Sequence, residues 1–533
     1  WDNKDRPVTN LKFGALSNKP DSLGSNCLNL YRNSNILQVV DKYVVVQDSE
    51  GREVESQLLP IANASLYLRS KYVKAYLGVS PTVTPKYWLA FRVSVPPLGF
   101  NTYFVSRAKQ AGSVSAMSTL NSSQGNKYSS LEIGQGHLKL IYNADGVLSK
   151  YLDSGSLVNA DIKQTYKFYS GFNGTNTDPQ ASGAYIFRPG GTFPIKSDVQ
   201  LTILRGSILD EVHQQINPWI YQVGPIPVED GIGKEVVAEI TTNMATNKAF
   251  YTDSSGRDFI KRIRDYRSDW QLQVTQPVAG NYYPINLGTY IKDNSTELSV
   301  LVDRSVGGSS IVDGQVELML HRRLLYDDGR GVGEALNETV CVNDDCAGLV
   351  IEGKYYLKFD SLGEGAKWRR TFGQEIYSPL LIAFSEQDGG NWASSHVVKF
   401  SAMDSSYSLP DNVAVLTLQA LEDGSVLLRL VHLYEVGEDK DLSVMASVEL
   451  KKIFPNKKII KITETNLSAN QERAEMEKKR LKWKVQQGSS GAETVVRGGP
   501  VDPSKLVVEL GPMEIRTFIL NLDYLAFVSA AGP

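Results

Sequence analysis

Alternation of apolar and polar residues with a period of two is the feature of this sequence that most constrains its fold. Such runs occur at residues 86–106, 136–152 and 314–325, among others. Successive side chains of a strand point to opposite faces, so this pattern is typical of strands with one buried face. Gly, Asp, Asn and Pro punctuate the runs, as they do in tight turns. The pattern predicts an all-β protein built from several antiparallel β-sandwich domains.

The chain has 533 residues, more than one hydrophobic core usually serves. Polar stretches at 106–126 and 386–396 indicate domain boundaries. One strongly helical pattern, residues 470–485, is charged nearly all round and is predicted to be a solvated helix or a loop. The domains that we expect are an N-terminal segment of uncertain structure (1–50), a small β-sandwich (51–110), a large β-supersandwich (111–390) and a C-terminal β-sandwich (391–533).

The composition excludes some classes of partner. The chain is 42% apolar and 22% charged, with a net charge of −3, which gives no electrostatic reason to expect nucleic acid or an anionic membrane. No stretch approaches twenty apolar residues, so no membrane span is expected. The sequence opens at Trp1 without a leader pattern, which suggests a processed or trimmed product.

The cysteines and the glycosylation sequons favour a secretory route. Cys341 and Cys346 bracket a loop short enough to be closed by a disulfide, which leaves Cys27 free or paired with another polypeptide. Scarce cysteines and N-x-S/T sequons together suggest a secreted, lysosomal or vacuolar protein. The candidate glycosylation sites are Asn63, Asn121, Asn173, Asn294, Asn337 and Asn466.

Several kinds of catalytic centre lack their motifs. The five histidines include no pair at the i+2 or i+4 spacing that places two imidazoles on one metal ion. No G-x-S-x-G elbow and no phosphate-binding P-loop motif is present. We therefore expect no metal site, serine nucleophile or nucleotide site built by this chain alone.

The segment ELMLHRRLLYDDGRGVGE concentrates charged residues. A glycosidase needs two carboxyl groups facing one sugar, but Asp327 and Asp328 are neighbours on an extended backbone and point to opposite faces. Arg322, Arg323 and Arg330 could instead hold these carboxylates in bidentate pairs. A structural brace is the favoured interpretation, and the alternatives are an interdomain or interchain contact and direct catalysis.

The segment VAGNYYPINLGTYI (278–291) is a candidate sugar contact. Two tyrosines precede a proline at the start of a strand, and tyrosine offers both an apolar face and a hydroxyl to a sugar ring. The alternative is a pair of ordinary half-buried aromatic residues. Trp392 is a second, weaker candidate platform.

Long ordered blocks of the sequence resemble a known family. DGQVELMLHRRLLYDDGRGVGE, GRDFIKRIRDYRSDWQLQVTQPVAGNYYPIN and VLLRLVHLYEVGED resemble the C-terminal half of class II α-mannosidases, glycoside hydrolase family 38. The lysosomal and vacuolar branch is the most similar, and PKYWLAFRVSVPPLGFNTYFVS resembles its plant members. The resemblance runs from about residue 50 to the end.

The resemblance implies a function shared between two chains. Family members are retaining, exo-acting enzymes that remove terminal α-mannose from N-glycans, with Zn²⁺ and the catalytic carboxylates in the N-terminal half. The family's early His-x-Asp and later His-His-Asp-Ala motifs are absent here. The resemblance therefore implies a C-terminal subunit without metal ligands or catalytic residues of its own. It would act in the vacuole or lysosome, paired with the N-terminal chain of the same precursor in a larger assembly of heterodimers.

One substrate contact of the family maps to this chain. The tyrosine of the family's N-[aromatic or aliphatic]-Y-P segment reaches the sugar site, and it corresponds to Tyr283, with Asn281 and Tyr282 as flanking supports. Two rival functions remain open on the residues alone. One is a non-catalytic carbohydrate-binding or structural β-protein, and the other is a self-sufficient glycosidase that uses Asp327 with Glu334.

Overall fold

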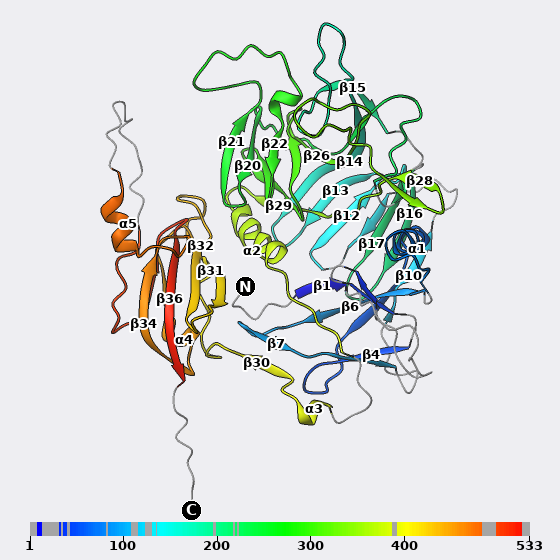
Figure 1. The fold of residues 1–533 in the computed structure, drawn as a ribbon. Helices are drawn as coiled ribbons and strands as arrows, with labels where there is room; N and C mark the ends of the chain where they lie inside the picture. Colours follow the sequence, from blue (N-terminus) through cyan, green and yellow to red (C-terminus); the bar gives the residue numbers. More distant parts are fainter. Residues whose placement is uncertain are drawn as a thin grey trace, which may run out of the picture.

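The computed structural model describes residues 8–12, 31–33, 36–39, 43–81, 84–107, 116–122, 130–134, 136–195, 199–216, 219–220, 223–385, 392–481 and 497–524. Strands account for 42% of the chain and helices for 11%, so the prediction of an all-β protein is confirmed. The sheets form three regions that follow one another along the chain (Figure 1). None of the helices in the described ranges is long and apolar enough to cross a membrane.

The first region is a small sheet around β6, with a second pair of strands packed on it. Val44 and Val46 of the pair pack against Leu58, Leu89 and Phe91 of the sheet. The sheet comprises β1 (Val8–Lys12), β2 (Tyr31–Asn33), β3 (Ile36–Val39), β5 (Ser56–Pro60), β6 (Tyr87–Val93) and β9 (Ala116–Met117), and the pair comprises β4 (Val44–Gln47) and β8 (Phe104–Arg107). Helix α1 (Asn63–Leu77) follows β5.

The second region contains the largest sheet, of nine strands. Its path is β11 (Leu131–Ile133), β12 (Leu138–Tyr142), β13 (Leu148–Asp153), β14 (Val158–Gly171), β19 (Lys234–Thr242), β26 (Gln315–Arg323), β25 (Val306–Ser309) and β22 (Tyr283–Ile285), with β15 (Pro189–Pro194) paired to β14. The predicted hairpin within 136–152 is present as β12 and β13. Bordering this sheet are a four-stranded sheet and the β27–β28 hairpin. These are β10 (Thr119–Ser122), β16 (Val199–Arg205), β17 (Glu211–Ile216) and β18 (Trp219–Ile220), with β27 (Thr339–Val342) and β28 (Asp345–Gly348).

A five-stranded sheet packs on one face of the nine-stranded sheet. It contains β20 (Ala249–Ser254), β21 (Asp258–Ile263), β23 (Gly288–Lys292), β24 (Thr296–Val302) and β29 (Tyr355–Ser361). Residues Ile162, Ile240 and Leu318 of the larger sheet meet Leu298 and Val300 of the smaller one in the main apolar core. The large sheet is therefore one layer of a sandwich, and the residues between these core positions point to its other face.

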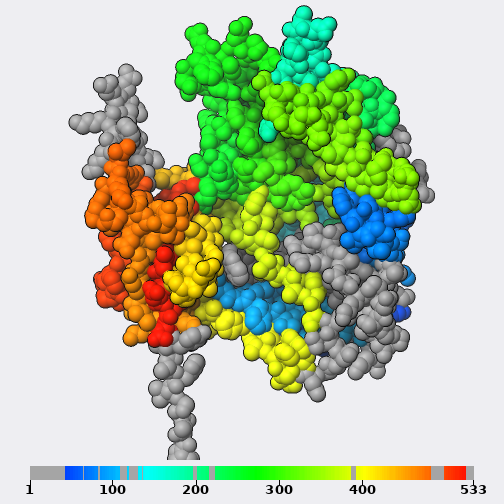
Figure 2. Space-filling model, viewed as in Figure 1, coloured from blue at the N-terminus to red at the C-terminus, as the bar shows by residue number. Residues whose placement is uncertain are grey.

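The third region is a C-terminal sandwich. Leu428, Leu430 and Phe518 of one layer pack against Val448 and Leu510 of the other. Its strands are β31 (Val413–Ala420), β32 (Val426–His432), β34 (Lys457–Thr465) and β36 (Ile515–Tyr524) in one layer, and β33 (Ala446–Glu449) and β35 (Val507–Leu510) in the other. Figure 2 shows this region, coloured yellow to red, as a lobe beside the green second region.

The helices differ from the sequence expectation. The structure has two helices of more than twelve residues that the periodicity did not predict, α1 and α2 (Gly365–Tyr377). The remaining short helices are η1 (Ala279–Asn281), α3 (Trp392–Ser395), α4 (Leu450–Ile453) and α5 (Arg473–Lys479). Helix α5 lies within the predicted 470–485 helix and buries no residue, as a solvated helix should.

Two strand pairings cross the expected domain limits. The strand β9 pairs with β5, although it lies beyond the expected boundary at residue 110. The strand β30 (Lys399–Ser401), which is early in the expected C-terminal sandwich, pairs with β7 (Gly99–Asn101) of the first region. The domain limits given above remain a proposal.

Candidate functional site

The strand β22 carries the predicted sugar contact at the edge of the large sheet. Tyr283 lies opposite Gly308 and Pro284 lies opposite Gly307 of β25. An edge strand tolerates proline because one side of its backbone is unpaired. A Cβ atom at Gly308 would lie 2.2 Å from the Ile285 Cδ1 atom and 2.9 Å from the Glu317 carbonyl oxygen, so glycine at this position allows the strands to pack this closely. The edge position and the two glycines of β25 together determine the position of Tyr283, the first residue of β22.

Tyr283 is half-buried and packs against the main core. Its ring meets the edge of Phe250 at a centroid distance of 5.8 Å, and the guanidinium carbon of Arg262 lies 4.2 Å from the ring centroid. The ring is thus held between an apolar residue and a cation. Within the described part of the chain, the Tyr283 hydroxyl makes no hydrogen bond, so it is available to a ligand.

Asn281 is buried and its side chain is fully used inside the protein. Its amide nitrogen donates hydrogen bonds to the Asp265 carboxylate and to the Pro277 carbonyl, both at 2.8 Å. Its amide oxygen accepts one from the Asp265 backbone N–H at 3.0 Å. The Ser309 hydroxyl donates to the Asn281 carbonyl at 2.7 Å. Asn281 therefore ties the loop before β22 to β25, which is a supporting role.

Tyr282 points to the opposite side of the strand from Tyr283, as neighbouring strand residues do. Its hydroxyl donates a hydrogen bond to the Glu317 carboxylate at 2.7 Å, and its ring packs on Phe187 with centroids 4.7 Å apart. Burial, together with the Glu317 charge, raises the pKa of the Tyr282 phenol well above its usual value. Tyr282 is therefore a neutral, half-buried donor, and its geometry is that of a support.

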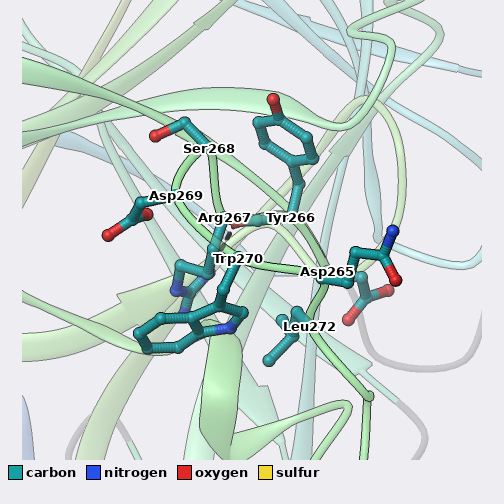
Figure 3. A pocket seen from close by; sticks show the side chains of 8 residues that line it. Asp265, Tyr266, Arg267, Ser268, Asp269, Trp270 and Leu272 are labelled. Atoms are coloured by element: carbon teal, nitrogen blue, oxygen red, sulfur yellow. Dashed lines mark hydrogen bonds between the residues drawn. The ribbon is translucent and has the colours of Figure 1, made fainter.

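A hollow lies in the loop that joins β21 to β22, which projects from the end of the sheet (Figure 1). It has a volume of about 530 Å³ and is lined by residues 265–272 (Figure 3). Tyr266 and Trp270 in this loop are 52% and 61% exposed. The loop starts at Asp265, which Asn281 holds, so it is anchored beside Tyr283. In the sequence, only two aromatic residues in a polar stretch mark this loop as a possible site.

Asp328 braces a turn, but not in the predicted way. Its carboxylate accepts hydrogen bonds from the backbone N–H groups of Tyr185, Ile186 and Arg330 at 2.6, 3.0 and 3.1 Å. Burial alone would raise the pKa of Asp328, but these three bonds lower it. Asp327 accepts a bond from the Gly329 N–H at 3.1 Å. Both aspartates thus act on backbone groups of turns.

The predicted arginine–aspartate pairs are wrong. Arg322 binds Glu235 instead, with two guanidinium nitrogens at 2.8 and 2.6 Å from one carboxylate oxygen. Arg330 donates to the Gln180 side chain, and Arg323 donates to the Asn337 side chain. The Asp328 carboxylate is occupied by backbone N–H groups, and the three arginine side chains bond to other partners.

Cys341 and Cys346 form a disulfide, with their sulfur atoms 2.03 Å apart, and join the hairpin of β27 and β28. Cys27 lies outside the described residues, as does the side chain of Asn121. Of the other candidate glycosylation sites, Asn466 is half-buried, and the exposed ones are Asn63, Asn173, Asn294 and Asn337.

The Trp392 ring packs against two other side chains of this chain. The ring stacks on His396 at a centroid distance of 4.5 Å and meets Phe104 edge-on at 5.9 Å. This arrangement favours a packing role over an open sugar platform.

The described residues do not fit the zinc ion that the family resemblance implies. Across the described ranges no three His, Cys, Asp or Glu side chains are grouped so that they could hold a metal ion. Tetrahedral zinc needs three or four such ligands from the protein.

Three family models match in order along the chain. These are the lysosomal alpha-mannosidase-like central domain at residues 54–105, the glycosyl hydrolases family 38 C-terminal domain at residues 133–330, and the glycosyl hydrolases family 38 C-terminal beta sandwich domain at residues 412–518. The second match contains the whole segment around Tyr283.

Curated relatives of the chain are named α-mannosidases. A probable α-mannosidase of Arabidopsis thaliana is 59% identical over 512 residues, which cover 91% of this chain and 50% of that protein. The α-mannosidase of Canavalia ensiformis is 50% identical over 507 residues, covering 91% and 51%, and the lysosomal α-mannosidase of Homo sapiens is 34% identical over 513 residues, covering 92% and 47%. The chain spans about half the length of the curated relatives that it matches.

A crystal structure of an α-mannosidase from Enterococcus faecalis V583 aligns over 98% of this chain and 55% of that chain. Its TM-score is 0.47 at 11% identity, which is too low to carry an argument. The family matches carry the assignment by themselves: the chain belongs to glycosyl hydrolase family 38, of which it contains the C-terminal domains.

Proposed function

We propose that this chain is the C-terminal subunit of a retaining, exo-acting α-mannosidase that hydrolyses terminal α-mannose from N-glycans. The observation that carries the proposal is the Tyr283 phenol. It lies inside the matched family domain, its ring is held by Phe250 and Arg262, and its hydroxyl is unbonded within the described residues. Such a group can donate a hydrogen bond to a sugar without giving up a bond in the protein.

The catalytic groups lie, on this proposal, on the N-terminal chain of the same precursor. In support, the relatives are α-mannosidases about twice as long as this chain, and the described residues contain no metal-binding cluster. Zn²⁺ and the carboxylates of that chain would supply the nucleophile and the acid. The two chains would form heterodimers that assemble further and act in the vacuole or lysosome, a route that the lysosomal relatives support.

Tyr283 would form one wall of the sugar pocket. Its hydroxyl would bond a hydroxyl of the mannose ring, most strongly when the ring is distorted toward the transition state. A net hydrogen bond contributes on the order of 1 kcal/mol, which corresponds to roughly ten-fold or somewhat less in rate. The supports at Asn281 and Tyr282 would keep this wall in place.

The first test is Tyr283→Phe in the full-length precursor, assayed on an aryl α-mannoside. The expected result is a kcat/KM about ten-fold lower with an unchanged melting temperature, because only the free hydroxyl is removed. Tyr251→Phe is a matched control, since Tyr251 is also half-buried, lies on β20 of the five-stranded sheet, which contacts β22, and makes no side-chain hydrogen bond with the described residues. An unchanged kcat/KM in Tyr283→Phe would refute the role of Tyr283.

The second test separates this proposal from a carbohydrate-binding or structural β-protein and from a self-sufficient glycosidase. Denaturing electrophoresis of the native material should show a second polypeptide, and turnover of the mannoside should stop when zinc is chelated. A single polypeptide that binds mannose without turnover would favour the carbohydrate-binding protein. Chelator-insensitive turnover by this chain alone would favour a glycosidase with its own acids.

A further inference from the structure

Glu317 is the hub of a buried polar cluster on the face of the large sheet that lies away from the main core. It lies on β26 and is fully buried. Its Oε2 atom accepts hydrogen bonds from the Tyr169 hydroxyl at 2.8 Å and the Tyr282 hydroxyl at 2.7 Å. Its Oε1 atom accepts one from the Lys167 ammonium at 2.6 Å. The carboxylate thus joins strands β14 and β26 to the residue before β22.

The charge of Glu317 is compensated within the cluster. Lys167 also contacts the Glu239 carboxylate at 2.7 Å. Burial alone would lower the pKa of Lys167, but the Glu317 charge and the bonds to Glu239 and Glu317 outweigh it and raise the pKa. Lys167 therefore stays protonated, and Glu317 keeps a partner for its charge. A carboxylate accepts a phenol hydrogen bond more strongly than a neutral oxygen does.

Glu317 is connected to Tyr283 through Tyr282, because Tyr282 and Tyr283 share a peptide bond. The backbone of β22 is also fixed on its far side, where one oxygen of the buried Asp253 accepts hydrogen bonds from the N–H groups of residues 286, 287 and 288 at 2.7, 2.9 and 3.1 Å. The three-residue strand is thus clamped by buried carboxylates before and after Tyr283.

We infer that Glu317 is a positioning residue for Tyr283, acting through the hydroxyl of Tyr282. Glu317 anchors Tyr282 on one face of the strand, and the adjacent Tyr283 is thereby aimed at the sugar from the other face. The inference rests on the proposed function, since it needs Tyr283 to touch the substrate. Glu317 is the first residue of the charged segment ELMLHRRLLYDDGRGVGE and lies 35 residues away from Tyr282 in the chain.

The cluster contains its own matched control. Tyr169→Phe and Tyr282→Phe each delete one phenol hydrogen bond to the same oxygen of Glu317, at nearly the same distance. Both variants are made in the full-length precursor, and the melting temperature and the kcat/KM on an aryl α-mannoside are measured. Similar losses of stability are expected from both. Only Tyr282→Phe should lower kcat/KM, by roughly three- to ten-fold, because loss of alignment cannot cost more than loss of the Tyr283 hydroxyl itself.

In a double variant, the kcat/KM distinguishes an effect that acts through the Tyr283 hydroxyl from a general effect on folding. In the Tyr283→Phe background the hydroxyl to be aimed is already gone, so adding Tyr282→Phe should leave kcat/KM within about two-fold of Tyr283→Phe alone. A multiplicative loss in the double variant, or equal losses of kcat/KM in Tyr169→Phe and Tyr282→Phe, would overturn the inference. If Tyr283→Phe alone is fully active, it is the proposed function that fails, so the two failures are distinguishable.

Discussion

The second and third regions of the molecule are both sandwiches, but they bury different kinds of residue. The second region places buried charges within its sheets, among them Glu235, Glu297, Glu317 and Asp253. The core of the third region, which contains Leu428, is an apolar cluster, and the buried Arg516 in this region pairs with Glu464 at 2.6 Å. Burying charge is costly unless each group is paired.

That difference shows where the fold is arranged to hold particular side chains. An apolar core stabilises a sandwich without directing any one residue, because the hydrophobic effect has no direction. Hydrogen bonds to a buried carboxylate do have direction. In the second region they converge on the ends of β22, next to Tyr283. We therefore regard the second region as the one that presents the site and the third as a scaffold.

The largest effect should come from breaking a buried ion pair in the second region. Arg369 of α2 contacts Glu297 of β24 at 2.7 Å, and both side chains are almost fully buried. Arg369→Met would leave Glu297 without its cation, and breaking such a pair typically costs about 3–5 kcal/mol. The free energy of unfolding, from urea denaturation, should fall by that order. A loss under about 1 kcal/mol would contradict the view that buried charge pairs hold this region.

A cavity in the third region should lower stability without touching the chemistry. Leu428 is fully buried in the core of the C-terminal sandwich. Leu428→Ala should lower the free energy of unfolding by about 2–5 kcal/mol. The kcat/KM of the folded protein should stay unchanged, since the site lies in another region. A lower kcat/KM in the folded Leu428→Ala protein would contradict the view that the third region is only a scaffold.

The smallest effect concerns pH and a buried histidine. His432 is fully buried, its Nδ1 atom accepts the Tyr434 N–H at 3.2 Å, and its Nε2 atom donates to the Val444 carbonyl at 2.8 Å. Burial lowers its pKa below the usual 6.5, so the folded protein keeps it neutral while the unfolded chain takes up a proton near pH 6.5. The stability due to neutral His432 is complete above pH 6.5 and is lost as the pH falls below that value toward the folded pKa.

The melting temperature should therefore fall between pH 7.5 and pH 5, and it should fall less in His432→Gln, which cannot be protonated. Comparing the two proteins isolates His432 from the other titrating groups. An identical pH dependence in both would show that His432 does not contribute.

The sequence predicted the strands well and the helices poorly, for a physical reason. Alternation along 136–152 follows from one buried face, and the structure has β12 and β13 there. Helix α2 turns Arg369 and Arg370 inward, where they contact Glu297, Glu435 and Glu438. Its buried face therefore looks polar in the sequence, and a search for apolar periodicity does not find it.

The candidate site was only partly predictable. The family resemblance predicts Tyr283 as a sugar contact with Asn281 and Tyr282 as its supports, and these three residues are consecutive in the chain. Glu317 could not be assigned from the sequence, since its phenol partners come from positions 169 and 282, which the sheet brings together. The arginine pairing failed for a related reason. Charges that are close in sequence compete with backbone N–H groups that only the folded turn supplies.

On the proposed function, this chain contributes the Tyr283 hydroxyl to a sugar pocket whose metal and acids belong to another part of the enzyme. The most direct test is an experimental structure of the complete protein with a mannose-derived inhibitor bound. We expect the Tyr283 oxygen to lie about 2.6–3.0 Å from a hydroxyl of the bound sugar, with the Tyr282–Glu317 hydrogen bond intact. A sugar ring bound beyond the reach of Tyr283, or a Tyr283 covered by protein, would contradict it.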